Sequence, residues 1–241
     1  MMADEFPLSE ELRRRSAGAR AKGVPYIVGV GGSVAVGKST FAAGLADAIA
    51  AWPEHPRVVN IATDGYLFPN TVLAERKISM RKGFPESYDV GALRAALIDI
   101  KAGKQVAMPR YSHVTYDVDA ANPMMVEKPD VLILDGLHLA QVEESGAARL
   151  IDCLIYLDAR EETIEGWFTA RLLPLMLAGR DDTASFYYAF REMGDAARAD
   201  FAKRVWNGIN LPNLRDHIVK DRAAADIIVT KNADHSIAAV A

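Results

Sequence analysis

The chain has 241 residues, of which half are apolar and a quarter are charged, and its formal net charge is −4. This length favours one α/β domain with a sizeable core over two domains. The weakly acidic balance argues against a surface for nucleic acid or an anionic membrane, and no apolar run reaches the roughly 18 residues of a membrane span. We therefore expect a cytoplasmic protein whose partners are small molecules.

The sequence pattern predicts a helical arm over residues 1–24 and the main domain over residues 25–241. Residues 4–22 show a charged, weakly amphipathic helical pattern that ends before Pro25. The start of the chain lacks the apolar core of a signal peptide, which is about 7–15 residues long. Such an arm either docks on the main domain or stays mobile.

Residues 25–42 join an apolar strand pattern, a glycine-rich turn and the start of a helix without a break. Within them, residues 32–39 fit G-x-x-x-x-G-K-[ST], the phosphate-binding loop. Its backbone N–H groups must curl around a phosphate, which requires glycine where φ is positive or the ligand comes close. The residues expected to bind the phosphates of a nucleoside triphosphate here are Gly32, Ser33, Val34, Ala35, Val36, Gly37, Lys38, Ser39 and Thr40.

The helix that begins at Lys38 directs its unpaired N–H groups and its positive dipole end at the same phosphates. The Lys38 ammonium can reach the outer phosphates, and the Ser39 hydroxyl is suited to bind Mg²⁺. A glycine-rich turn without a ligand is the alternative. The strand and helix patterns on either side favour the nucleotide site.

An alanine-rich helix is predicted over residues 39–51, and a short strand over residues 57–63. Asp64 follows that strand directly. Because parallel sheets bind ligands at the carboxyl ends of their strands, we expect Asp64 on the same side as the phosphate loop. The alternative is a helix cap or a turn residue ahead of Gly65.

Residues 66–88 are too polar, and too interrupted by proline and glycine, for a core element, and they predict a long functional loop. Asp89 is expected to cap a helix whose apolar positions repeat every 3.6 residues and which ends before Gly103. Residues 108–117 are polar and aromatic without a helical period. Taken alone, His113 within them is an ordinary surface histidine.

Residues 131–135 form an apolar run that closes on Asp135, as in a buried parallel strand with a Walker-B-type carboxylate. Asp135 is therefore expected to help hold Mg²⁺ or its water. A further buried strand is predicted over residues 153–157, followed by Asp158 as a helix N-cap. Cys153 begins that strand, and a lone buried thiol is more often a packing residue than a reactive one.

The next helix has an apolar stripe at helical spacing, and Arg171 falls on it. A guanidinium on an apolar stripe needs an anionic partner, for which phosphate is the obvious candidate. An arginine that reaches solvent at the edge of the stripe is the alternative. The stripe consists of Ile164, Trp167, Phe168, Leu172 and Leu175.

Towards the C-terminus the patterns predict a helix over residues 183–206, a loop over residues 206–217 and a last strand over residues 225–230. Strands therefore alternate with helices along the chain. The predicted fold is a P-loop NTPase fold, with a doubly wound, mostly parallel sheet, helices on both faces and a partly helical lid.

Several of these segments together resemble type I pantothenate kinase, a member of the P-loop kinase group that includes uridine kinase and phosphoribulokinase. KGFPESYD at 82–89 and YSH-x-x-YDV at 111–118 are more specific than the phosphate loop. The resemblance runs from residue 25 to the C-terminus. The matching segments are 32–40, 63–70, 81–90, 109–118, 132–137, 167–171, 209–214 and 230–235.

The resemblance implies an enzyme that uses ATP and Mg²⁺ to phosphorylate pantothenate, the first step of coenzyme A synthesis. It implies that Lys38 binds the ATP phosphates, that Asp64 is the general base and that Arg171 steadies the transferring phosphoryl group. It implies Mg²⁺ ligands at Ser39 and Asp135. The residues implied to lie beside the nucleotide are Lys231 and His235, and those implied to contact pantothenate are Lys82, Tyr111, His113, Phe168 and Asn210.

The chain also departs from the family pattern. Phe168 stands where the family has a substrate-contacting tyrosine, and Leu172 and Leu175 stand where it has phenylalanines. Asp135 replaces a glutamate. Ala43 replaces an arginine that binds the inhibitor coenzyme A, so we expect an enzyme that binds ATP but resists this inhibitor.

Two other functions are compatible with the sequence. One is a kinase of another hydroxylated metabolite, a nucleoside or a sugar, because the departures cluster where the acceptor would be recognised. The other is a nucleotide-binding regulator, against which Asp64 argues, since a sensor needs no base on the acceptor side. We also expect a homodimer.

Overall fold

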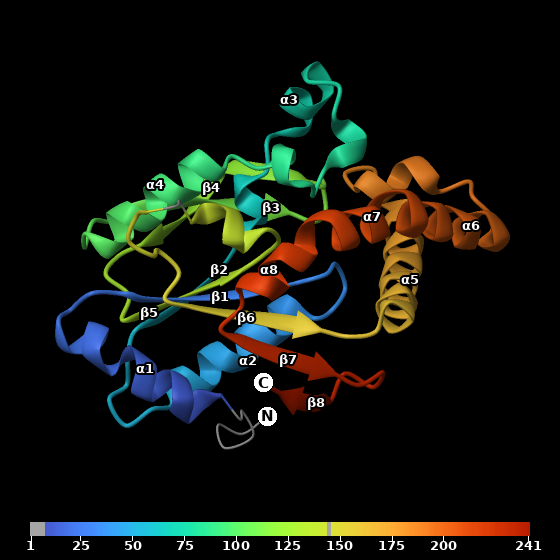
Figure 1. The fold of residues 1–241 in the computed structure, drawn as a ribbon. Helices are drawn as coiled ribbons and strands as arrows, with labels where there is room; N and C mark the ends of the chain where they lie inside the picture. The colour runs from blue at the N-terminus through green and yellow to red at the C-terminus, as the bar shows by residue number, and fades with distance from the viewer. Residues whose placement is uncertain (1–7, 144–145) are drawn as a thin grey trace.

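A computed structural model describes residues 8–143 and 146–241 and has a six-stranded sheet at its centre (Figure 1). The strand order is β2-β5-β1-β6-β7-β8, and all pairs are parallel except β7 with β8. The strands are β1 (Tyr26–Gly32), β2 (Val58–Ala62), β5 (Val131–Asp135), β6 (Cys153–Asp158), β7 (Ile227–Lys231) and β8 (Ile237–Val240).

Two hydrophobic clusters lie on opposite faces of this sheet, because alternate side chains of a strand point to opposite faces. In β1, Val28 and Val30 belong to one cluster and Ile27 to the other. Helices α1 (Ser9–Ala21) and α2 (Lys38–Ala50) cover the first face, and α4 (Val90–Lys101) covers the second (Figure 1). The doubly wound α/β fold predicted from the sequence is confirmed.

A third cluster forms the lid beside the carboxyl ends of the strands, where it joins α5 to the C-terminal helices. Trp206, which is fully buried, lies at its centre against Phe168 of α5. The remaining helices are α3 (Asn70–Glu75), α5 (Glu161–Ala178), α6 (Asp195–Val205), α7 (Leu211–Asn213) and α8 (Val219–Ala224).

Several predicted boundaries agree closely with the structure. The helix from Lys38, the strands at residues 58–62 and 131–135 and the helix over residues 90–101 are all present. The side chain of Asp89 accepts a hydrogen bond from the backbone N–H of Ala92, as expected of an N-cap. Cys153 is fully buried in the core. Within residues 66–88, α3 and short 3₁₀ turns interrupt the predicted loop.

Residues 108–117, which lack a helical period in the sequence, belong to a two-stranded antiparallel sheet. Its strands are β3 (Val106–Ser112) and β4 (Asp117–Val126). The register shifts between Met108 and Arg110, on either side of Pro109. Because proline cannot donate to a strand ladder, it occurs at such irregularities and hides the strand pattern.

Two predictions for the lid are wrong. The helix predicted over residues 183–206 is a 3₁₀ turn at 186–190 followed by α6, which begins only after Gly194. The loop predicted over residues 206–217 is helical, with π-helical turns at 206–210 and 214–218 on either side of α7. The Asn, Gly and Pro residues of this segment indicate a loop by composition, whereas packing of Trp206, Leu214 and Ile218 stabilises a helix.

Asp158 does not cap the helix that follows it. It is the last residue of β6 and forms an ion pair with Arg222, while the N-cap position of α5 is Arg160. At the N-terminus, α1 docks on the main domain, since Leu12 is buried in the same cluster as Leu45 of α2. The predicted helix over residues 4–22 begins outside the described residues.

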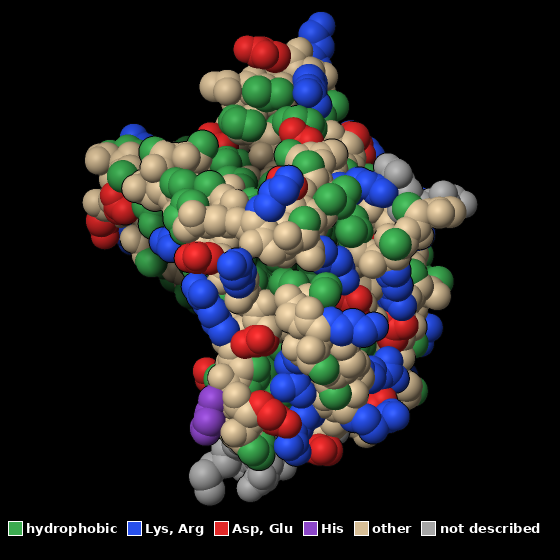
Figure 2. Space-filling model, turned by 90° about the vertical axis from the view of Figure 1, so that its left-hand side faces the viewer, with side chains coloured by type: hydrophobic (Ala, Val, Ile, Leu, Met, Phe, Trp, Pro, Cys, Tyr) green, Lys and Arg blue, Asp and Glu red, His purple; other side chains and the backbone are tan. Residues whose placement is uncertain are grey.

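No helix in the described part of the chain is long and apolar enough to cross a membrane. On the face of the molecule drawn in Figure 2, Asp and Glu side chains lie among the Lys and Arg side chains.

Gly65 provides a test of the contact between the β2 tip and β3. A Cβ atom at Gly65 would lie 2.0 Å from the carbonyl oxygen of Pro109, so Gly65→Ala must displace backbone. We expect a loss of about 1–3 kcal/mol in the free energy of unfolding, measured by urea denaturation. Gly166→Ala in α5 is the control, because its Cβ would meet nothing within 4 Å; it should be neutral or stabilising by up to about 1 kcal/mol. Equal stabilities of the two variants would contradict the contact.

Candidate active site

Three adjacent strands end together and bring the predicted chemical groups to one edge of the sheet. Asp135 ends β5 and pairs in register with Val30 of β1 on one side and with Ala62 of β2 on the other. The phosphate loop leaves β1 two residues beyond Val30, and Asp64 follows Ala62 by two residues. The strand order β2-β5-β1 therefore puts Asp64, Asp135 and the phosphate loop side by side.

The backbone of the phosphate loop can be formed only with glycine at two positions. Gly32 has φ of 138°, and a Cβ atom there would lie 2.6 Å from the carbonyl oxygen of Leu157. Gly37 has φ of 91°, in the left-handed region, immediately before the first residue of α2. This conformation suits the glycine-lined cradle that a phosphate group requires.

Lys38 lies beneath this loop, with its Nζ donating a hydrogen bond to the carbonyl oxygen of Ser33 at 2.9 Å. Burial lowers the pKa of the Lys38 ammonium, and the negative charges of Asp64 and Asp135 oppose that effect. The buried hydroxyl of Ser33 has no hydrogen-bond partner among the described residues. An orphaned hydroxyl beside a desolvated ammonium fits a site that receives an anionic ligand.

Ser39 and Asp135 offer oxygen ligands of the kind that Mg²⁺ prefers. The Ser39 hydroxyl donates to Oδ1 of Asp135 at 3.3 Å, and burial raises the pKa of that carboxyl while Lys38 lowers it. Within the described ranges, no three His, Cys, Asp or Glu side chains gather into a metal cluster. Mg²⁺ in kinase sites is commonly held by one or two carboxylates together with substrate phosphates, and this pair fits that mode.

Asp64 is oriented by a residue that the sequence reasoning did not single out. The phenol of Tyr88 donates to Oδ1 of Asp64 at 3.1 Å, and Tyr88 is buried. Burial raises the pKa of Tyr88 well above its ordinary value, so the phenol stays a donor. The sequence signal for Tyr88 is its place in the specific segment KGFPESYD at 82–89.

Lys82, which the sequence predicts to contact the acceptor, is held against the β3–β4 hairpin. Its Nζ donates to Oδ1 of Asn70 and to the carbonyl oxygen of Tyr116, both at 2.6 Å. It also lies 5.1 Å from the ring centroid of Tyr111. Burial lowers the pKa of Lys82. His113, in the hairpin turn, is exposed and has its ring edge-on to Tyr111 at 5.2 Å.

Two of the predicted substrate-contacting residues, Asn210 and Phe168, lie in the lid. The side-chain nitrogen of Asn210 is buried without a hydrogen-bond partner among the described residues, which leaves a donor free for a ligand. Phe168 packs in the lid cluster with its ring centroid 5.9 Å from that of Trp206.

Arg171 is exposed, so the prediction that it lies on the buried stripe of its helix is wrong. The buried residues of α5 are Ile164, Phe168, Leu172 and Met176. Arg171 belongs to the adjacent row and matches the alternative of an arginine that reaches solvent. After burial, the positive charge of Arg171 is a further influence that lowers the pKa of Lys38.

The β7–β8 turn reaches the phosphate loop from the other side. Nζ of Lys231 donates to the carbonyl oxygen of Val36 at 3.0 Å, and His235 stacks on Trp167 with ring centroids 4.0 Å apart. The indole N–H of Trp167 donates to the carbonyl oxygen of Ala233. In the sequence Trp167 stands on the apolar stripe and begins the matching segment 167–171, and in the structure it ties this turn to α5.

His138 is a second residue that the sequence reasoning missed. It lies three residues beyond Asp135 in the left-handed conformation, with φ of 57°, and is only 4 % exposed. Its Nε2 is 2.8 Å from the carbonyl oxygen of Gly83, the residue after Lys82. Burial lowers the pKa of His138 from 6.5 to about 4, so the imidazole is neutral near pH 7.

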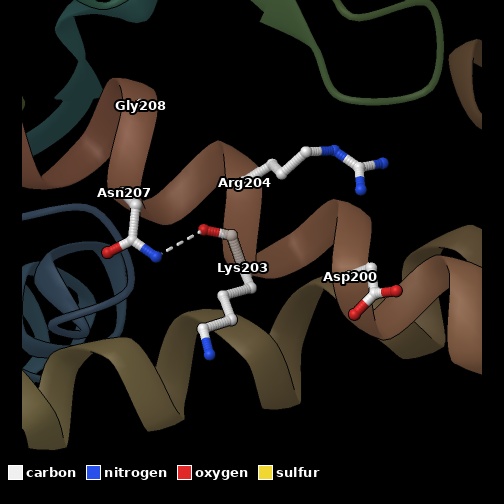
Figure 3. A pocket seen from close by; sticks show the side chains of 5 residues that line it. All are labelled: Asp200, Lys203, Arg204, Asn207 and Gly208. Carbon is white, nitrogen blue, oxygen red and sulfur yellow. Dashed lines mark hydrogen bonds between the residues drawn. The ribbon is translucent and has the colours of Figure 1, made fainter.

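A surface hollow of about 460 Å³ lies elsewhere, on α6 and the π-helical turn after it (Figure 3). Its lining residues all come from this one helical stretch, and all are exposed. The hollow contains none of the predicted site residues. It is lined by Asp200, Lys203, Arg204, Asn207 and Gly208.

Residues 27–167 match the phosphoribulokinase/uridine kinase family. The chain is 44% identical over 221 residues to the pantothenate kinase of Sorangium cellulosum, covering 90% of this chain and 72% of that protein. It is 45% identical over 226 residues to the pantothenate kinase of Corynebacterium diphtheriae, covering 92% of this chain and 73% of that protein. This chain is a member of the pantothenate kinase family.

Solved structures agree at the level of the fold. Phosphoribulokinase from Rhodobacter spheroides superposes with a TM-score of 0.53 at 19% identity, covering 86% of this chain and 70% of that chain. Kinases with this phosphate loop use ATP and Mg²⁺ in general.

His138 predicts a specific dependence of stability on pH. The pKa of its imidazole is about 4 in the folded protein, against an ordinary value of 6.5, so the unfolded chain binds the proton more readily. The stabilisation from the neutral ring is complete above pH 6.5 and is lost as the pH falls towards 4, a change of about 3 kcal/mol. Urea denaturation from pH 7 to 4 should show the wild type losing about that much more than His138→Gln. Parallel stability curves of the two proteins would contradict the burial effect.

Proposed function

We propose that this protein transfers the γ-phosphoryl group of ATP to the primary hydroxyl of pantothenate. The observation that carries the proposal is the convergence of the phosphate loop, Asp135 and Asp64 at three adjacent strand ends, next to an acceptor side built around Lys82. The likeness to pantothenate kinases over about nine-tenths of the chain supports the choice of acceptor.

Phosphoryl transfer asks a protein mainly for positioning and charge stabilisation. The backbone N–H groups of residues 32–40 would bind the phosphates of ATP, and Lys38 would balance their outer charge. Mg²⁺, held by Ser39 and Asp135, would supply further charge neutralisation when bound. Arg171, exposed on the lid helix, would reach the transferring group when the lid closes over it.

Asp64 would act as the general base. Its Oδ1 accepts the hydrogen bond from Tyr88, which fixes the carboxylate at the tip of β2. The other oxygen is then available to take the proton of the acceptor hydroxyl as the new bond to phosphorus forms. A turn residue alone would have no need of this buried donor.

The acceptor side has groups that match pantothenate, which carries a carboxylate, an amide and two hydroxyls. Lys82 offers an ammonium, Tyr111 a phenol, His113 an imidazole and Asn210 an unpaired amide N–H. Phe168 would line the wall towards the lid. Lys231 and His235 would flank the nucleotide from the β7–β8 turn. A homodimer, a cytoplasmic location and a separate arm at residues 1–24 stay predictions of the sequence.

The proposal predicts which acceptor stimulates ADP release. In a coupled assay with ATP and Mg²⁺, pantothenate should raise the rate well above basal hydrolysis, whereas nucleosides and simple sugars should not. Turnover of a nucleoside or sugar without turnover of pantothenate would reject the acceptor and leave the reaction type intact.

The proposed base predicts the kinetics of substituted enzymes. Asp64→Ala should lower kcat by ~10²–10⁴, the usual effect of losing a positioned base, with little change in ATP binding. Arg171→Ala should also lower kcat. Asp47→Ala, an exposed aspartate of α2, is the control and should leave kcat unchanged. Near-wild-type kcat in either site variant would remove that residue from the mechanism.

A further inference from the structure

One short loop, residues 82–88, supplies both sides of the proposed transfer. Its first residue, Lys82, belongs to the acceptor side, and its last, Tyr88, holds the carboxylate of Asp64. A shift of this loop would therefore displace an acceptor contact and the base together. What holds the loop in place thus matters for the reaction.

Part of the support is internal to the loop. The N–H of Gly83 donates to the hydroxyl of Ser87, which in turn donates to the carbonyl oxygen of Phe84. The far end of the loop is anchored by backbone bonds, since Phe68 N–H donates to the Ser87 carbonyl and Leu67 bridges Tyr88. These contacts fix the shape of the loop and one of its ends.

At the other end, in addition to the side-chain contacts of Lys82 and the bond from the Phe84 N–H to the Arg81 carbonyl, the loop is held through the carbonyl oxygen of Gly83. This oxygen accepts from Nδ2 of Asn213 at 2.7 Å and from Nε2 of His138 at 2.8 Å. Because a carbonyl can only accept, His138 must carry its proton on Nε2. The two donors, His138 and Asn213, are 4 % and 3 % exposed, and both come from elements distant from the loop in the sequence.

Each donor sits next to another part of the site. His138 follows the tip of β5, three residues after Asp135, in a left-handed conformation that is uncommon for a residue other than glycine. Asn213 ends α7, between the two π-helical turns of the lid and three residues after Asn210. π-helical turns frequently occur at functional sites. The Gly83 carbonyl thus joins the acceptor loop to the metal-binding strand and to the lid.

We infer that His138 and Asn213 are positioning residues that hold the acceptor loop through the Gly83 carbonyl and so align Lys82 and Tyr88 with the phosphate loop. The kinetic part of this inference rests on the proposed function. Edge-to-face ring contacts also support the arrangement. The ring centroids of His138 and Tyr88 are 5.9 Å apart, and those of His217 and Phe84 are 5.7 Å apart.

The test uses the full-length protein with His138→Ala, Asn213→Ala and the double substitution. His138→Gln is the matched variant, because the glutamine side-chain nitrogen can replace the Nε2 donor. The first readout is hydrogen exchange of the free protein, which does not depend on the acceptor. The amides of residues 83, 84 and 86–88 should exchange faster in the double variant, while those of α2 stay as in the wild type.

The second readout is kinetic. Each single alanine variant should raise the KM for pantothenate by about three- to tenfold, the effect of one hydrogen bond, with the KM for ATP unchanged. The rise in the KM for pantothenate should be larger in the double variant than the product of the two single rises, because only the double variant removes both donors to Gly83. His138→Gln should restore the KM for pantothenate.

Three results would overturn the inference: unchanged exchange of the loop, an equal rise in the KM for ATP, or independent effects of the two substitutions. Failure of the proposed function would look different. The wild type would then not phosphorylate pantothenate, and the faster exchange of the loop in the double variant would still be observed.

Discussion

The close approach of β1 and β6 at Gly32 is the constraint on which the site depends. Any side chain there would collide with the carbonyl oxygen of Leu157, so only glycine lets the chain leave the sheet at this point and turn into α2. That exit sets the position of Lys38 and the direction of the helix N-terminus. From the opposite side, Lys231 holds the Val36 carbonyl and prevents the loop from moving away from β7.

The charged groups around this loop are arranged for a ligand that brings negative charge. Burial lowers the pKa of Lys38 and raises that of Asp135, because burying either group in its charged form costs free energy when no opposite charge is near. Their mutual attraction offsets part of that cost, and a bound phosphate would offset more for the lysine. Lys82 is in a similar position beside the β3–β4 hairpin, where two oxygens compensate for its loss of water.

The sequence was sufficient to predict the elements whose signal is local. Apolar runs identified β1, β5 and β6, and the glycine spacing identified the phosphate loop, so Asp64 and Asp135 could be assigned to one edge of the sheet. The hairpin at residues 106–126 was missed because Pro109 interrupts its pattern. The exposure of Arg171 depends on which side of α5 meets Trp206, and the roles of Tyr88 and His138 depend on contacts between distant segments. None of these has a signature in spacing alone.

The strand order also bears on how the chain folds. β1 is paired on one side by β5 and on the other by β6, and β2 is paired by β5. During synthesis from the N-terminus, neither early strand has a partner until residues 131–135 have left the ribosome. Parallel pairings of this kind form slowly and leave apolar strands uncovered in the meantime. The nascent chain therefore presents β1 without a partner strand while residues 33–130 are being added, which is about two-fifths of its synthesis.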